Sequence, residues 1–286
     1  MRNKHKATMV FLYTCFFALI SCVLMASPYK RVVSHGIATD DILLALANPG
    51  QIASLSHLAH SAYAYNAALA KRYPMLKNSS AENILSFNPD LVLLTSFSSP
   101  ESVAILKRSG VKLYIVEKYE SLEDVYTTLL EVGDLLGQRQ KAEILIASCR
   151  SRVNSLAKAL EGVKPVRVIL AAEYSFISGT NTTFQELCDH AGAINVAAEA
   201  GISGIAPIPS EKMLSWKIDY LIGWQEPGSK MTERLKAVAP FRFLDAYKQG
   251  KLIEMPGALF MTTSHHRVTA FEMLARILHP ERFQDK

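Results

Sequence analysis

Short apolar runs alternate with longer amphipathic stretches from residue 31 to the end of the chain. Aliphatic and β-branched residues are concentrated in runs at 31–34, 51–56, 91–95, 112–116, 166–172, 220–223 and 251–255. Several stretches between these runs have apolar positions at helical spacing and begin with Ser, Thr or Asp caps. This alternation predicts an α/β protein in which parallel strands are covered by helices on both faces.

One helix–strand pattern occurs twice, at 81–94 and at 210–223. In each copy a glutamate, a Leu-Ser-aromatic triplet and an aspartate recur in the same register, and an apolar strand follows. Asn88-Pro89 ends the first helix, because proline lacks an amide donor and restricts the residue before it. Chance likeness between two ordinary helix–strand units is the alternative, but the shared register favours two similar lobes.

A long helical stretch separates these lobes. Its apolar residues repeat at helical spacing with Lys and Arg between them, and Pro165 follows. We therefore expect a rigid linking helix over 133–163, between an N-terminal lobe at 27–132 and a C-terminal lobe at 164–286. Two further helical segments are predicted, a mostly helical connector over 57–73 and a helix over 267–278.

The first 26 residues have a basic start followed by an apolar run, which is typical of a secretory signal peptide. Two processing sites compete. Ala26-Ser27 suits an ordinary signal peptidase, whereas the segment ending at Cys22 resembles the box in which bacterial lipoproteins are lipidated. A retained membrane anchor is a third interpretation, because the apolar run approaches the ~20 residues that span a bilayer. We expect an exported, periplasmic protein, with cleavage after residue 26 and with lipid anchoring through Cys22 as the alternative.

The 286 residues are 49% hydrophobic and 20% charged, which is a globular composition with room for two domains. The formal net charge of +5 includes Arg2, Lys4 and Lys6, so the exported chain would carry only +2. That charge is too small, and too evenly spread, to indicate binding to nucleic acid.

The motifs of several enzyme classes and metal sites are absent from the sequence. There is no GxSxG, HExxH, GxxxxGK[ST] or glycine-rich dinucleotide pattern, and no Cys/His spacing that suits zinc. Cleavage at residue 26 would leave Cys149 and Cys188, which form either a disulfide or two separate buried thiols. We therefore expect no catalytic residue, no cofactor and no resident metal ion.

Segments spread along the chain resemble the iron-siderophore/cobalamin periplasmic binding proteins, which are the substrate-binding components of ABC importers. The segments are 31–43, 82–91 with its Asn88-Pro89-Asp90, 110–116, 133–137, 191–197, 204–211 and 278–281. The resemblance implies two Rossmann-like lobes joined by a long backbone helix, the class III architecture, with the ligand between the lobes. His35 stands where that family usually has a small residue, which leaves the identity of the ligand open.

The resemblance also gives a role to the two glutamates of the repeated pattern. Glu82 and Glu211 match the exposed glutamates, one in each lobe, with which this family docks onto arginines of an inner-membrane permease. Two carboxylates held far apart would fix the orientation of the docked protein through charge-assisted pairs. The alternative for each is that an acidic residue stabilises the start of its own helix.

Ligand contacts vary within the family, so we choose candidates by their position on loops and strand ends. Ligand-binding loops gather at the carboxyl ends of parallel strands. The candidates are His35, His57, Tyr63, Phe97, Tyr174, Phe176, Trp224, His265 and Arg267. Flat aromatic rings suit a macrocycle or catecholate, and Arg267 suits ligand carboxylates. Core packing of the aromatic residues and simple helix capping by the His265–Arg267 cluster are the alternatives.

The predicted function is that of a monomeric periplasmic protein that captures a metal chelate between its lobes. The chelate would be a ferric siderophore, cobalamin or haem, and the partner would be an ABC permease in the inner membrane. The alternative is an exported α/β enzyme that acts on a small molecule in the same cleft.

Overall fold

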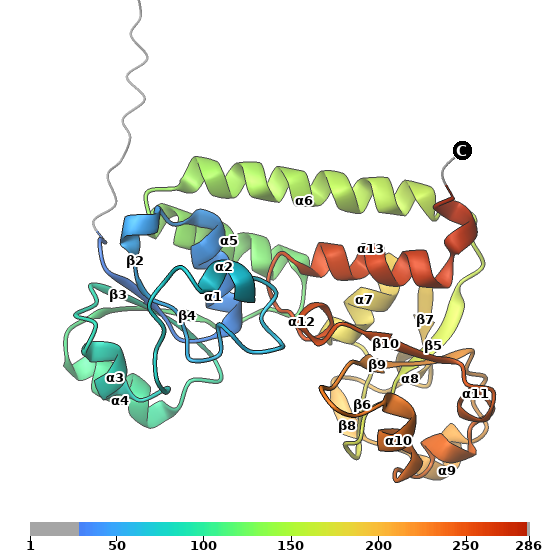
Figure 1. Cartoon of the computed structure of the whole chain (residues 1–286). Helices are drawn as coiled ribbons and strands as arrows, with labels where there is room; N and C mark the ends of the chain where they lie inside the picture. Colours follow the sequence, from blue (N-terminus) through green and yellow to red (C-terminus); the bar gives the residue numbers. More distant parts are fainter. Residues whose placement is uncertain (1–28, 285–286) are drawn as a thin grey trace, which may run out of the picture.

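The computed structural model describes residues 29–284, whose main strands form two separate four-stranded parallel sheets (Figure 1). The strand orders are β2-β1-β3-β4 and β10-β9-β5-β7. The predicted signal peptide and Cys22 lie outside the described residues. Among residues 29–284, no helix has both the length and the apolar character needed to cross a bilayer.

The first sheet belongs to the N-terminal lobe, which is the part of the described chain before helix α6. Its strands are β1 (Val32–Ser34), β2 (Ile52–Ser54), β3 (Leu91–Thr95) and β4 (Lys112–Val116). The helices of this lobe are α1 (Ile37–Leu46), α2 (Ala67–Ala70), α3 (Ala81–Leu85), α4 (Pro100–Arg108) and α5 (Leu122–Leu135), with a 3-10 turn at Pro49–Gln51.

The second sheet belongs to the C-terminal lobe, which follows α6. Its strands are β5 (Val166–Leu170), β7 (Ala193–Asn195), β9 (Tyr220–Trp224) and β10 (Leu252–Met255). A separate antiparallel pair consists of β6 (Phe176–Ser178) and β8 (Ile205–Pro207). The helices are α7 (Thr183–Ala191), α8 (Val196–Glu199), α9 (Ser210–Met213), α10 (Met231–Lys236), α11 (Asp245–Lys248), α12 (Gly257–Phe260) and α13 (Arg267–Leu278), with 3-10 turns at Phe241–Phe243 and Pro280–Arg282.

Helix α6 (Arg139–Ala159) joins the two lobes and confirms the predicted fold class, two α/β lobes linked by a long helix (Figure 1). The linking helix predicted over 133–163 is shorter in the structure. Gly137 has a φ of +65°, a left-handed conformation that ends α5, and α6 begins only at Arg139.

Residues 57–73 are not mostly helical, contrary to the sequence-based prediction. Only α2 is helical there, and most of the rest consists of turns in which the amides of Ala59, Ser61 and Ala64 each bond to the carbonyl three residues earlier. Small and polar residues interrupt this segment, so it has no continuous apolar stripe to bury as a helix.

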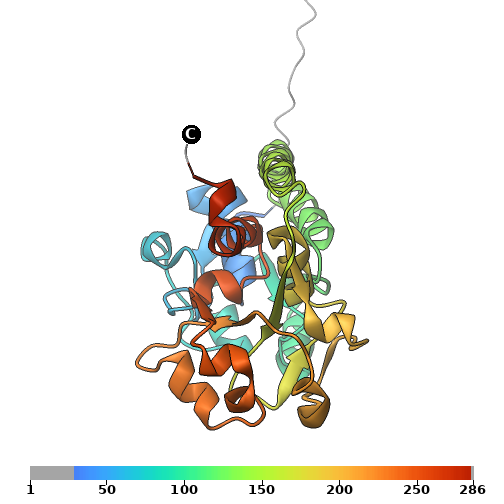
Figure 2. The ribbon, with the colours of Figure 1, turned by 90° about the vertical axis from the view of Figure 1, so that its right-hand side faces the viewer.

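One cluster of buried side chains lies beneath α5, α6, α7 and α13 and runs through both lobes. It includes Leu129, Ile146, Leu187 and Phe271, which are each at most 8% exposed. In both views α13 runs beside α6 (Figures 1 and 2). Burying such a side chain contributes about 1.5–3 kcal/mol, so the placement of the lobes depends on a shared core and not on the linking helix alone.

The repeated helix–strand pattern builds the same turn in each lobe. In the N-terminal lobe the Asp90 carboxylate accepts the Arg31 amide at 3.0 Å, and the Asp90 amide donates to the Arg31 carbonyl at 3.0 Å. In the C-terminal lobe the Asp219 carboxylate accepts the Arg167 amide at 2.9 Å, and the Asp219 amide donates to the Arg167 carbonyl at 2.7 Å. Both arginine side chains donate Nε to carbonyls in the turn that follows the short helix. The recurring aspartate therefore anchors the start of β1 or β5.

Replacing Asp90 or Asp219 by alanine should weaken one of these turns at a time. We expect each variant to lose about 1–2 kcal/mol of unfolding free energy, because a backbone amide loses a charged acceptor. Urea unfolding followed by circular dichroism measures the loss. Asp245→Ala is the control, because Asp245 pairs on the surface with Lys248 at 3.6 Å, a contact expected to contribute little. If Asp90→Ala and Asp219→Ala were as stable as this control, the turn would not be an anchor.

Candidate ligand-binding cleft

A cavity of about 430 Å³ opens between the two lobes. The N-terminal lobe supplies Phe97, which follows β3, and Tyr119, which follows β4. The C-terminal lobe supplies the rest of the wall, which comes from β5, β6, α7, β8, β9, α12 and the start of α13. The larger side chains of this wall are Leu170, Tyr174, Phe176, Phe184, Leu187, Ile205, Trp224, Leu259, Phe260, Met261, Arg267 and Phe271. The carboxyl ends of parallel strands from both sheets therefore meet at this cavity, as expected for α/β lobes.

Aromatic rings form a row along the C-terminal wall. Trp224 lies between Tyr174, at a ring-centroid distance of 6.3 Å, and Phe260, at 5.6 Å, with interplanar angles of 21° and 27°. On the facing wall the rings of Phe97 and Tyr119 are 5.5 Å apart. Phe97 is 77% exposed and Tyr174 is 59% exposed. Clustered exposed apolar side chains around a concavity are a feature of binding sites.

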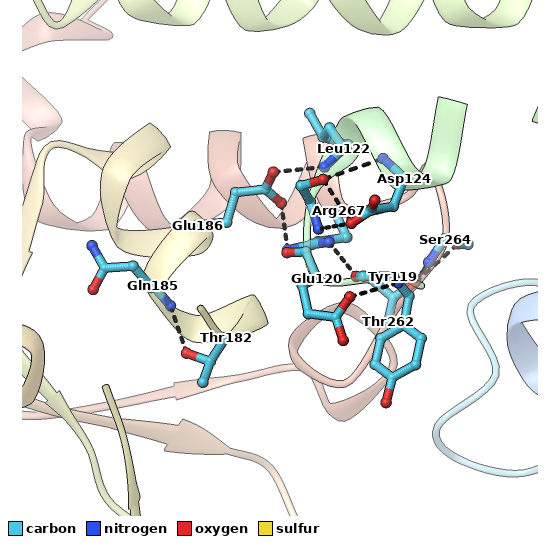
Figure 3. A network of polar contacts seen from close by, with 11 residues as sticks. Tyr119, Glu120, Leu122, Asp124, Thr182, Gln185, Glu186, Thr262, Ser264 and Arg267 are labelled. Atoms are coloured by element: carbon cyan, nitrogen blue, oxygen red, sulfur yellow. Dashed lines mark hydrogen bonds and ion pairs between the residues drawn. The ribbon is translucent and has the colours of Figure 1, made fainter. Parts of the chain in front are cut away.

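Arg267 lines the cavity and forms a buried joint between the lobes (Figure 3). It is 2% exposed, and its guanidinium donates to the carbonyls of Tyr119 at 2.8 Å and Glu120 at 3.0 Å. It also pairs with Glu186, whose other oxygen accepts the Leu122 amide at 2.6 Å. Burial lowers the pKa of Arg267 and raises that of Glu186, and each partner opposes the shift of the other. The guanidinium is thus engaged by protein groups.

Two aspartates of α1 are buried where the lobes meet. Asp40 accepts the Ser56 amide at 2.8 Å, and Asp41 accepts Asn66 Nδ2 and Ser264 Oγ, both at 2.9 Å. Ser264 belongs to the C-terminal lobe, so the Asp41 carboxylate connects the lobes. Burial is the main cause that raises the pKa of each aspartate to about 6, and the hydrogen bonds act in the opposite direction.

His266 lies beside Asp41, and the His265 ring lies next to the His266 ring at a centroid distance of 4.1 Å. His266 Nε2 is 2.8 Å from Asn66 Nδ2 and 3.8 Å from Asp41 Oδ1, and the His266 ring stacks on Tyr65 at 4.0 Å. Burial lowers the pKa of His265 to about 4 and that of His266 to about 3. At neutral pH both imidazoles are therefore uncharged. Neither of the two lines the cavity.

Five of the nine sequence-predicted ligand residues line the cavity, and four do not. Those in its wall are Phe97, Tyr174, Phe176, Trp224 and Arg267.

The four candidates outside the wall are His35, His57, Tyr63 and His265. His35 instead bonds to Ser98 Oγ at 2.9 Å and to the Ser79 carbonyl at 3.2 Å. Tyr63 bonds across to Glu226 at 2.6 Å.

Sequence reasoning missed several wall residues, among them Tyr119, Ile205, Phe260 and Met261. Tyr119 follows the carboxyl end of β4, so the rule that selected Phe97 would also have selected it. Ile205 lies in β8, and the β6–β8 pairing brings it to the wall.

Cys149 and Cys188 are both free and buried, which excludes the disulfide alternative. Burial raises the pKa of both thiols, as expected for cysteines that pack in a core. Within residues 29–284, His, Cys, Asp and Glu side chains do not form a group of three or more that could hold a metal ion.

Comparison with known proteins gives a consistent result. The sequence pattern of a family described as periplasmic binding protein matches residues 32–259. The uncharacterized ABC transporter substrate-binding lipoprotein YvrC of Bacillus subtilis is 21% identical over 217 residues, which covers 73% of this chain and 68% of that protein.

Two solved structures share the fold. The periplasmic heme-binding protein RhuT from Roseiflexus sp. RS-1, in its apo form, has a TM-score of 0.76 at 23% identity, covering 88% of this chain and 99% of that one. A periplasmic heme-binding protein from Pseudomonas aeruginosa has a TM-score of 0.75 at 21% identity, covering 88% and 93%.

The two buried aspartates, Asp40 and Asp41, and the two buried histidines, His265 and His266, should have opposite effects on the stability of the fold between pH 4 and 6.5. The raised pKa of Asp40 and Asp41 favours folding at low pH, and this contribution is lost as the pH rises from about 4 to about 6. The lowered pKa of His265 and His266 favours folding above pH 6.5, and this contribution is lost as the pH falls towards 4. In the wild type the two effects offset each other.

The double variant His265→Gln/His266→Gln should therefore expose the aspartate effect. We expect its melting temperature to fall as the pH rises from 4 to 7, whereas the wild-type profile stays flatter. Calorimetry of both proteins at four pH values in that range makes the comparison. A double variant whose profile kept the wild-type shape would contradict the assignment.

Proposed function

The chain belongs to the periplasmic binding protein family, and we propose that it is the monomeric substrate-binding component of an ABC importer for a flat, largely apolar metal chelate. The ligand would lie in the cleft between Phe97 and Tyr119 on one wall and the Tyr174–Trp224–Phe260 row on the other. The protein would act outside the cytoplasmic membrane, either free in the periplasm or anchored through Cys22, and would deliver its ligand to an inner-membrane permease. Membership of a family of binding proteins favours this function over the exported-enzyme alternative.

The main support for this proposal is the set of aromatic rings in the wall of the cavity. Aromatic rings on both sides of a cavity offer dispersion and apolar contact to a planar ligand, and they require little charge complementarity. Exposed aromatic side chains held on strand ends are already in place before the ligand arrives, so little ordering entropy is lost on binding.

The charge and the size of the cavity favour haem over ferric siderophores and cobalamin. Among the described residues that line the cavity, Arg267 is the basic side chain, and its donors are engaged by Tyr119, Glu120 and Glu186. A polyanionic ferric catecholate would need free cations for charge-assisted hydrogen bonds. Cobalamin is much bulkier than a cavity of about 430 Å³. The names of the two structural relatives described above point to the same ligand.

Phe97→Ala and Tyr174→Ala should each weaken haemin binding, because each removes one exposed ring from a wall of the cleft. We expect the Kd to rise about tenfold for each variant, in line with the 0.5–1.5 kcal/mol of a ring pair plus its buried area. Titration of the purified protein followed by Soret absorbance measures the Kd. Phe243→Ala is the matched control, since Phe243 is an exposed aromatic residue outside the cavity wall. Unchanged affinity in both cleft variants would remove the basis for this site.

Glu82 and Glu211 are the proposed contacts with the permease. Both side chains are exposed, and each is the second residue of a short helix, α3 or α9. These two helices lie on the side of the molecule opposite α6, one in each lobe (Figure 1). Because the two glutamates lie in different lobes, they would form two separate ion pairs with one surface of the permease. These pairs would fix the orientation of both lobes.

The double variant Glu82→Ala/Glu211→Ala should lose transport in cells while keeping its affinity for haemin within a few-fold. Growth on haemin as the iron source, together with the Kd of the purified protein, separates docking from capture. The matched control is Glu101→Ala/Glu233→Ala, because these glutamates are also exposed and lie in the first turns of α4 and α10. Loss of affinity along with transport, or equal loss of transport in the control, would argue against docking by Glu82 and Glu211.

A further inference from the structure

Tyr63 makes a contact between the lobes that is separate from the Arg267 joint. Its hydroxyl donates to Glu226 Oε2 at 2.6 Å, across 163 positions of sequence. Its ring lies against the backbone of Gly257, where an added Cβ would be only 2.9 Å from Tyr63 Cδ1. Glycine at this position therefore lets the ring of an N-terminal-lobe residue pack directly on the start of α12.

The same carboxylate oxygen holds an indole of the cavity wall. Trp224 Nε1 donates to Glu226 Oε2 at 3.1 Å, and the Trp224 carbonyl accepts Arg234 Nη2 at 2.6 Å. Hydrogen bonds thus hold both the backbone and the side chain of Trp224, and only the bond to the side chain comes from Glu226. Two donors stabilise the charged carboxylate, and the hydrogen bond from Tyr63 is the main cause that lowers the pKa of Glu226.

We propose that Tyr63 and Glu226 form a latch that keeps the cleft closed and fixes the orientation of Trp224. Both are positioning residues, because neither lines the cavity. Opening of the lobes would pull Tyr63 away from Glu226 and Gly257 together, which would leave the indole as the remaining donor to that oxygen. The inference rests on the proposed function, since a planar ligand packed along the aromatic row would be retained while the latch is closed.

A second Tyr–Glu hydrogen bond provides a matched control. Tyr114 Oη donates to Glu131 Oε2, also at 2.6 Å, but both residues belong to the N-terminal lobe. Tyr63→Phe and Tyr114→Phe each remove one phenolic oxygen from a bond of the same length. Only Tyr63→Phe should change the distance between the lobes.

The first measurement needs no ligand. Spin labels at Lys107→Cys and Lys236→Cys, on exposed positions of α4 and α10, report the distance between the lobes by pulsed electron resonance. We expect Tyr63→Phe to broaden the distance distribution and Tyr114→Phe to leave it unchanged. Gly257→Ala should act like Tyr63→Phe, because its methyl group displaces the ring.

The second measurement tests the position of the indole. In a Trp216→Phe background the fluorescence comes from Trp224, the other tryptophan of the chain. Glu226→Ala should increase quenching by acrylamide, and Glu226→Gln should restore much of the protection because its amide oxygen still accepts both donors. Glu226→Met keeps the length of the side chain but lacks a strong acceptor, so it should be quenched like Glu226→Ala. If it protected the indole as well as Glu226→Gln does, packing alone would explain the effect.

The third measurement is the rate at which bound haemin leaves the protein. We expect Tyr63→Phe to raise it about fivefold to tenfold, as the loss of one hydrogen bond to a charged acceptor predicts, and Tyr114→Phe to leave it unchanged. If Tyr63→Phe and Tyr114→Phe give the same distance distribution, the latch is overturned, even when the wild type binds haemin. If the wild type binds no chelate, the proposed function fails, and the measurements without ligand still decide for or against the latch.

Discussion

The buried guanidinium of Arg267 constrains the rest of the structure. A charge removed from water must be satisfied by its surroundings, and breaking a buried pair by removing one partner costs about 3–5 kcal/mol. Arg267 meets this requirement with two carbonyls of the N-terminal lobe and with Glu186 of the C-terminal lobe. The lobes therefore cannot move apart at this point without leaving charge unpaired. Because one of the carbonyls belongs to Tyr119, the joint also sets the position of a residue of the cleft wall.

The remaining contacts between the lobes differ in strength. The core beneath α6, α7 and α13 is apolar and continuous, and Asp41 adds a buried hydrogen bond to Ser264. At the Tyr63–Glu226 contact the lobes meet through one hydrogen bond and one ring packed on a glycine. Separation at the Tyr63–Glu226 contact would break fewer interactions than separation at the shared core. The exposed rings of Phe97 and Tyr174 stand on strand ends that such a motion would carry as rigid units.

Local signals were sufficient for most of the secondary structure. Strands β3 and β4 and helix α13 begin and end where the sequence signals predict. These signals are apolar runs, Pro89 and helix caps, and each of them acts over a few residues. The turns at 57–73 were missed, since apolar content alone does not specify a helix. The cleft was predicted in part. The strand-end rule found Phe97 and Trp224, whereas Ile205 reaches the wall only through the pairing of β6 with β8, which leaves no local pattern.

Arg267 shows most clearly why a site cannot be predicted from residue type alone. In the sequence it follows two histidines near the start of a helix, and a cation in that setting suits the carboxylates of a ligand. In the structure the same cation lines the cavity, yet it bonds to the protein on several sides. A ligand-binding arginine differs from a structural one in how many of its donors have no protein partner. For Arg267 that number depends on residues 147 and 148 positions away in the sequence. A wall whose arginine is engaged in this way distinguishes ligands by shape and apolar area, which is why the aromatic row, and not the charge, indicates the class of ligand.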